Sequence, residues 1–159
     1  METTTDTPWL TAPQQAVWRA FLGGTTLLMD RLDRDLRSAH DLSMAEYEVL
    51  VRLSESPDRA IRMAELAAAL AHSRSRVTHT ISRLEKDGLV RRGQCSTDGR
   101  GVSAILTDKG FAALEQAAHT HVRGVHAYLV ENATPEEFEV LGRIMQRVVD
   151  DLDVNNTCD

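Results

Sequence analysis

Apolar residues recur at intervals of three and four along most of the 159-residue chain, and this spacing predicts a mainly helical protein. Three expected helices begin with Ser or Thr followed three residues later by Gln or Glu, the capping-box pattern of a helix start, at Thr11, Ser43 and Thr134. Helical spacing or strong helix-forming composition covers residues 11–39, 43–55, 64–71, 73–87, 107–131 and 134–152.

The pattern changes after Gly88, where two short runs rich in β-branched or apolar residues are typical of strands. These runs are Val90–Gln94 and 102–107, and the Asp98-Gly99 pair between them is a strong hairpin-turn signal. Residues 61–63 are a candidate third strand that pairs with this hairpin. The sequence therefore predicts a mainly α fold with a small β-hairpin.

The helix expected over residues 73–87 has one apolar and one polar face. Val77, Ile81 and Leu84 form an apolar stripe, and the opposite face and its flanks carry Arg, Ser, Thr, His and Lys. Such a polar face suits the major groove of DNA, although it is also typical of an ordinary solvated helix. The hairpin favours DNA, because a helix followed by a basic hairpin is the layout of a winged helix-turn-helix. In that layout Arg100, near the hairpin tip, enters a minor groove.

Several segments of this region together resemble the MarR family of bacterial transcriptional regulators. The matching segments are Leu66-Ala67, the Ser-Arg-Ser-Arg-Val-Thr run at 73–78, the Arg-Leu-Glu-Lys-Asp-Gly-Leu-Val-Arg-Arg run at 83–92, the wing Asp-Gly-Arg-Gly at 98–101 and the Leu-Thr-Asp-Lys-Gly run at 106–110. The similarity extends over roughly residues 15–150, nearly the whole chain.

The resemblance implies a winged helix-turn-helix head at 43–107 with dimerisation helices at 11–39 and 107–152. It implies a homodimer in which the first and last helices of two subunits intertwine and two recognition helices read a pseudo-palindrome. It also implies that Asp98 pairs with an arginine near the recognition helix and fixes the wing. The apolar faces of the long helices agree with a dimer, and a monomer in which those helices cover each other is the alternative.

The candidate DNA-binding residues divide by expected role. We expect base-edge or groove-floor contacts from Ser75, Arg76, Thr78 and His79. We expect phosphate contacts from Arg74, Ser82, Arg83 and Lys86. Arg100 is the expected minor-groove residue, while Arg91 and Arg92 are equally well explained as solvated strand residues.

Charge is distributed in a way that supports this division. The net charge of −6 argues against a wholly basic nucleic-acid binder. Residues 72–109, however, hold eight Lys and Arg against four acids, while the segments on either side are acidic. A basic island in an acidic chain is expected where one face meets phosphate and the rest stays soluble.

Length and composition fit a single domain over residues 1–159, with flexible tails at 1–10 and 153–159. No apolar run is long enough to span a membrane, and the N-terminal residues lack the basic start and apolar core of a signal peptide. We therefore expect a cytoplasmic protein. The two cysteines, Cys95 and Cys158, do not make a disulfide framework.

The regulatory input stays open between two classes. The resemblance implies a small aromatic, lipid-like or drug-like effector in a cleft between the dimer helices and the head. Candidate lining residues are Trp9, Trp18, Phe21, Met44, Tyr47 and Val122, although Trp18 and Phe21 also fit a dimer core. The second class is oxidant sensing by Cys95, whose thiol pKa nearby arginines would lower, with Cys158 as a conceivable partner. A small half-buried strand residue is the plainer interpretation of Cys95.

Other functions have weaker support. His119, His121 and His126 lack the spacing that places two ligands on one helical turn, so we expect no metal and no cofactor. No nucleotide-binding glycine loop or Ser/His/Asp array is visible, so we expect no enzyme activity. A protein-interaction module on the same fold is the alternative of another class, but it would not need Arg100 or a polar recognition face. The sequence leaves open the operator, the regulated genes and the direction of regulation.

Overall fold

A computed structural model of the chain describes residues 7–70, 73–94 and 101–156. It contains α1 (Ala12–His40), α2 (Met44–Ser54), α3 (Met63–Ala69), α4 (Arg74–Lys86), α5 (Asp108–Tyr128), α6 (Pro135–Asn156), the strands β1 (Ala60–Arg62), β2 (Val90–Gln94) and β3 (Val102–Leu106), and the 3₁₀ turns η1 (Pro57–Arg59) and η2 (Val130–Asn132). The fold is therefore mainly helical with one small sheet, and this prediction from the sequence is confirmed.

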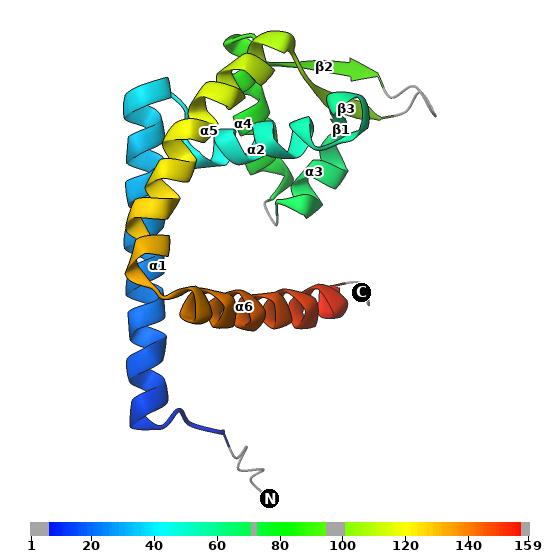
Figure 1. Cartoon of the computed structure of the whole chain (residues 1–159). Coiled ribbons are helices and arrows are strands. Elements are labelled where there is room, and N and C mark those ends of the chain that lie inside the picture. The colour runs from blue at the N-terminus through cyan, green and yellow to red at the C-terminus, as the bar shows by residue number, and fades with distance from the viewer. Residues whose placement is uncertain (1–6, 71–72, 95–100, 157–159) are drawn as a thin grey trace, which may run out of the picture.

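The elements form two regions of different character. Helices α2, α3 and α4 and the three strands make a head at one end of the long helix α1, and α5 packs along the upper part of α1 (Figure 1). Helix α6 then leaves the end of α5 and extends to one side, with no other described element packed along it (Figure 1). We refer below to the head (residues 43–107) and to the terminal helices (α1, α5 and α6).

The capping boxes set the helix starts where the sequence predicts them. The Thr11 hydroxyl accepts from the backbone N–H of Gln14 at 3.4 Å, and the Gln14 side chain accepts from the backbone N–H of Thr11 at 2.9 Å. The same reciprocal pair of bonds joins Ser43 to Glu46 and Thr134 to Glu137. Each box satisfies backbone donors that a helix end leaves free, so local sequence fixes these three boundaries.

The sheet is antiparallel with the strand order β1-β3-β2. The hairpin pairs Val90 with Leu106, and β1 adds a third strand in which Ile61 lies opposite Ala104. A third strand pairing with the hairpin is thus confirmed. It ends one residue earlier than expected, because Met63 already begins α3.

Thr107 joins the recognition region to α5. Its hydroxyl donates toward the carbonyls of Gly88 and Leu89 at 2.8 and 3.0 Å and accepts from the backbone N–H of Gly110 at 3.0 Å. Lys109 donates to the Asp87 carbonyl at 2.7 Å, at the end of α4. A Cβ atom on Gly110 would lie 2.0 Å from the Leu89 carbonyl oxygen, so only glycine permits this close approach.

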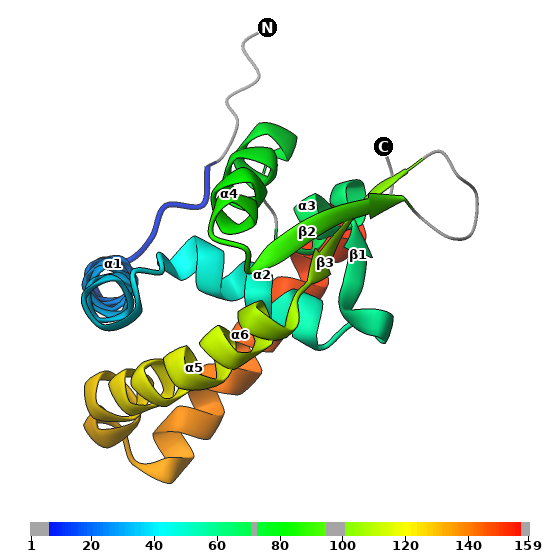
Figure 2. The same cartoon turned by 90° about the horizontal axis from the view of Figure 1, so that it is seen from above.

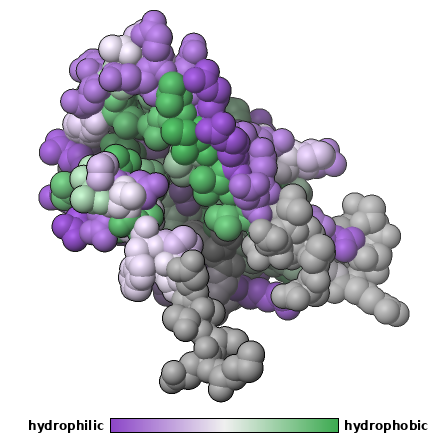
Figure 3. Space-filling model, turned by 90° about the horizontal axis from the view of Figure 1, so that it is seen from below, coloured by the Kyte–Doolittle hydropathy of each residue, from purple (hydrophilic) through white to green (hydrophobic). Residues whose placement is uncertain are grey.

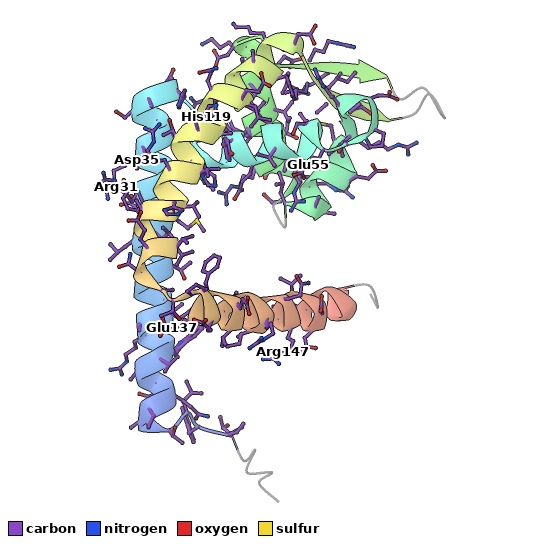
Figure 4. All side chains as sticks on the ribbon, viewed as in Figure 1. Arg31, Asp35, Glu55, His119, Glu137 and Arg147 are labelled. Carbon is purple, nitrogen blue, oxygen red and sulfur yellow. The ribbon has the colours of Figure 1, made fainter. Side chains whose placement is uncertain are left out.

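Large apolar side chains are exposed along the terminal helices. The set on α1 and α6 includes Val17, Trp18, Leu22, Ile144, Val148 and Leu152. Seen from below, hydrophobic side chains gather into a band on this side of the molecule (Figure 3). Ile144, Val148 and Leu152 recur at four-residue intervals along α6, so the helix has an apolar stripe beside polar residues such as Arg147, labelled in Figure 4.

Candidate nucleic-acid interface

Helix α4 follows its N-cap Ser73 and is held in the head by its apolar face. The Ser73 hydroxyl caps the helix by accepting from the backbone N–H of Arg76 at 3.3 Å. Val77, Ile81 and Leu84 are at most 1% exposed, so the apolar stripe expected from the sequence is buried in the head core. Gly88 follows in a left-handed conformation with φ +74°, which glycine adopts without strain and which turns the chain into β2.

The opposite face of α4 is exposed, and it carries the side chains that the sequence nominates. All eight are exposed: Arg74, Ser75, Arg76, Thr78, His79, Ser82, Arg83 and Lys86. Seen from above, α4 and the hairpin β2–β3 lie uncovered on the same side of the head (Figure 2). The head therefore offers a polar helix next to a projecting hairpin on one open surface.

The cations on this face differ in their partners. Within the described part of the chain, no ion pair neutralises Arg74, Arg76 or Lys86. Arg83 differs, because its Nε donates to Oε1 of Glu46 on α2 at 3.0 Å. Arg74, Arg76 and Lys86 therefore lie at the open surface without an ion-pair partner among the described residues.

Arg92 on β2 connects the hairpin to α4. Its guanidinium donates to the Ser82 hydroxyl at 2.9 Å and pairs with Glu85 at 3.2 Å. The Ser82 hydroxyl in turn donates to the Thr78 carbonyl at 2.8 Å, so its hydrogen is committed within the helix. The structure thus gives Arg92 a contact with the recognition helix, which the sequence did not predict.

Cys158 and three residues of the expected wing region lie outside the described residues. The three wing residues are Asp98 and Arg100 in the expected turn, and Cys95 at the end of the first wing strand. The strands on either side of the turn are described and pair in register up to Gln94 opposite Val102. The expected roles of these three residues stay predictions.

A cavity of about 390 Å³ lies between α2, the end of α3 and α5. Met44, Val51 and Leu70 are among its apolar lining residues, and the Tyr47 and His121 rings lie 4.7 Å apart at its wall. Burial lowers the pKa of His121, although the nearby Glu48 carboxylate opposes that shift. His121 is therefore held mainly as the neutral imidazole beside the cavity, and its Nδ1 atom is buried without a hydrogen-bond partner.

The six candidate pocket residues do not share one cavity within a single chain. Met44 and Tyr47 line the cavity just described, whereas Val122 lines a shallower hollow on α5 together with His119, which is labelled in Figure 4. Trp18 and Phe21 stack on each other at 5.9 Å near the far end of α1, and Trp9 is 84% exposed there. The sequence grouped these residues by chemistry, but α1 carries its aromatic residues away from the head.

Sequence reasoning missed His121, Glu48 and Arg52 as residues of the cavity wall. A helical wheel alone does not identify them, because their approach depends on how α5 crosses α2. Among the described residues, no three His, Cys, Asp or Glu side chains gather into a metal-binding group. No helix in the described ranges is both long enough and apolar enough to cross a membrane.

Comparison with known proteins shows that the chain is similar to transcriptional regulators. Residues 40–101 match the family model described as the MarR family. Over 132 residues the chain is 30% identical to the HTH-type transcriptional regulator PecS of Dickeya dadantii, an alignment that covers 80% of each protein.

Two solved structures of MarR family transcriptional regulators from Streptomyces coelicolor match nearly the whole chain. Sco3205, crystallised in complex with DNA, is 45% identical with a TM-score of 0.86, covering 91% of this chain and 94% of that one. AbsC is 37% identical with a TM-score of 0.86, covering 92% of this chain and 99% of that one. The similarity thus includes the terminal helices as well as the head.

Proposed function

The chain belongs to the MarR family of transcriptional regulators, and from this premise we propose that it is a homodimeric repressor that leaves its DNA operator when a small ligand binds. In this proposal the head at 43–107 reads DNA, and the helices at 11–39 and 107–152 form the dimer. A two-fold dimer places its two α4 helices about one DNA turn apart, so the operator is a pseudo-palindrome.

The observation that carries the proposal is the open face of α4. Arg76 and Lys86 are exposed and have no ion-pair partner among the described residues, next to a hairpin on the same side of the head. Buried apolar residues fix the helix from behind, which presents these cations as a rigid surface. The 45% identical Sco3205 was crystallised in complex with DNA, which supports DNA binding by this chain.

DNA binding tests the proposal directly. We expect the protein to bind a duplex from its own upstream intergenic region in preference to an unrelated duplex. Arg76→Gln and Arg100→Gln should each abolish specific binding while sedimentation still gives a dimer. Arg143→Gln on α6 is the matched control, because it removes the same charge far from α4. Specific binding that survives both changes would refute the assignment of the DNA face.

Salt dependence gives a second measure of the same contact. If the dimer neutralises roughly 6–8 phosphates, the logarithm of affinity should fall against the logarithm of salt concentration by about 0.9 per phosphate. A slope near zero for the wild-type protein would contradict a phosphate-binding face.

The cavity between α2 and α5 supports the ligand part of the proposal. Val51→Trp would fill it, whereas Val122→Trp adds the same bulk to the separate hollow on α5. Small aromatic compounds that release the wild-type protein from DNA should lose their effect on Val51→Trp and keep it on Val122→Trp. Equal release of both variants would place the effector elsewhere.

A further inference from the structure

Glu46 is a buried carboxylate at the boundary between α2 and the recognition helix. Its side chain is only 4% exposed. One carboxylate oxygen, Oε2, accepts from the backbone N–H and the hydroxyl of Ser43, both at 2.7 Å, and so completes the capping box of α2. The other oxygen, Oε1, accepts from Nε of Arg83 on α4 at 3.0 Å. One side chain therefore both starts α2 and holds α4.

A buried carboxylate needs a partner, because it has lost its hydration. Arg83 is the cation that pairs with Glu46 within the described chain. Arg37 also lies close to it, but Arg37 pairs with Asp33 at 2.6 Å, and that bond is the main cause that raises the Arg37 pKa, with Glu46 adding to it. Glu46 is therefore paired mainly with Arg83, and this pair restrains the turn of α4 that carries Arg83.

Arg83 lies on the flank of α4, next to the residues expected to meet bases. At 100° per residue, Arg83 and Arg76 share one side of the helix, and His79 lies between them toward the open face. A bond that fixes Arg83 thus fixes the rotation of α4 about its axis, which sets where Arg76 and His79 point.

We propose that Glu46 is a positioning residue for DNA recognition, and that Arg83 anchors α4 to Glu46 instead of neutralising a phosphate. This inference rests on the proposed DNA-binding function and revises the role expected for Arg83 from the sequence. It predicts that Glu46 governs the preference for the operator, while the expected phosphate contacts of Arg74 and Lys86, which set binding to any duplex, do not depend on it.

The opposite flank of α4 offers a matched control. Glu85 pairs with Arg92 at 3.2 Å, also between α4 and a neighbouring element, but these side chains are 41% and 36% exposed. Exposed ion pairs contribute little, because water solvates both charges when they separate. Glu85→Gln and Glu46→Gln make the same chemical change to a carboxylate that pairs with an arginine. The Glu85 carboxylate is exposed, whereas Glu46 is buried and only its partner Arg83, 47% exposed, reaches the surface.

The experiment measures affinity for the operator duplex and for an unrelated duplex of equal length over a series of salt concentrations. Gln at position 46 can still accept from Ser43, but its amide presents no negative charge to Arg83. Glu46→Gln should weaken operator binding by about tenfold or more, the size of one lost base contact. Binding to unrelated DNA and the salt slope should stay unchanged. Glu85→Gln should stay within about twofold of wild type on both duplexes.

Arg83→Gln separates an anchor from a phosphate contact. We expect reduced operator preference with an unchanged salt slope, whereas Lys86→Gln, at an expected phosphate contact, should lower the slope. A slope that falls by about 0.9 per protomer in Arg83→Gln would overturn the inference, because it marks a lost phosphate contact. If Arg83→Gln folds poorly, the double variant Glu46→Gln/Arg83→Met removes both charges. It should regain thermal stability without regaining operator preference.

The outcomes separate this inference from the proposed function. A wild-type protein that does not distinguish the operator from unrelated DNA would refute the proposed function, and this inference with it. The inference alone would be refuted if the wild-type protein prefers the operator and a folded Glu46→Gln dimer prefers it equally strongly.

Discussion

The head and the terminal helices both contain large apolar residues, but the head buries them and the terminal helices leave many of them exposed. In the head, Leu50 and Leu84 are fully buried, whereas on the terminal helices Val17 is 70% exposed and Leu152 is 62% exposed. The core of the head is therefore complete within one chain, with Leu36 of α1 and Leu114 of α5 contributing to it. The terminal helices keep apolar faces that a second copy would cover, which supports the proposed dimer.

The largest expected effect is a loss of stability when a mutation creates a cavity in the core of the head. Leu50→Ala should lower the free energy of unfolding by about 2–5 kcal/mol, because Leu50 is fully enclosed and the neighbouring side chains cannot close the gap. Leu152→Ala makes the same change on α6 and should cost less. Urea unfolding at two protein concentrations measures both, and only the cost of Leu152→Ala should depend on concentration. Equal costs at both concentrations would contradict the division into two regions.

A charge placed on the apolar face of α6 should act on assembly. Val148→Asp puts a carboxylate where the partner chain is expected to pack, and we expect a dimer dissociation constant raised by roughly 10–100-fold, since desolvating that charge opposes association. Gln146→Asp adds the same charge to the other side of α6 and serves as control. Sedimentation equilibrium measures both constants, and a dimer unaffected by Val148→Asp would exclude α6 from the interface.

The smallest effect concerns pH. Burial lowers the pKa of His121 below its ordinary value of 6.5, so near and below that pH the unfolded chain binds more protons than the folded chain. Stability should therefore fall as the pH decreases through 6.5. His121→Phe keeps a ring against Tyr47 and should flatten this dependence. His119→Phe, on the exposed side of α5, should leave the pH dependence unchanged. Unfolding of the three proteins at pH 7.5 and 5.5 measures the difference.

Local rules placed most of the fold correctly. The capping boxes at Thr11, Ser43 and Thr134 and the N-cap at Ser73 predicted helix starts that the structure confirms. These signals depend on residues within one turn of each other, so they can be read without the tertiary structure. The exposure of the polar face of α4 followed in the same way from its periodicity.

Contacts between distant segments could not be predicted in this way. The sequence shows Glu46 as part of a capping box, but its bond to Arg83 spans 37 positions and depends on how α2 packs on α4. Trp18 and Tyr47 do not meet within one chain, since α1 is long enough to carry Trp18 away from the head, and their grouping in a dimer cleft stays a prediction. Residue chemistry suggests candidates, and only packing decides which of them meet.

The junction at Thr107, Lys109 and Gly110 has a consequence for operator architecture. It ties the end of α4 directly to α5, which packs along α1, so in a dimer each recognition helix would be fixed to the shared scaffold without a flexible joint. One base pair inserted between two half-sites rotates one against the other by about 35°. Recognition helices fixed in this way cannot both realign with the rotated half-sites. Half-site spacing should therefore be as strict a requirement for binding as the half-site sequence itself.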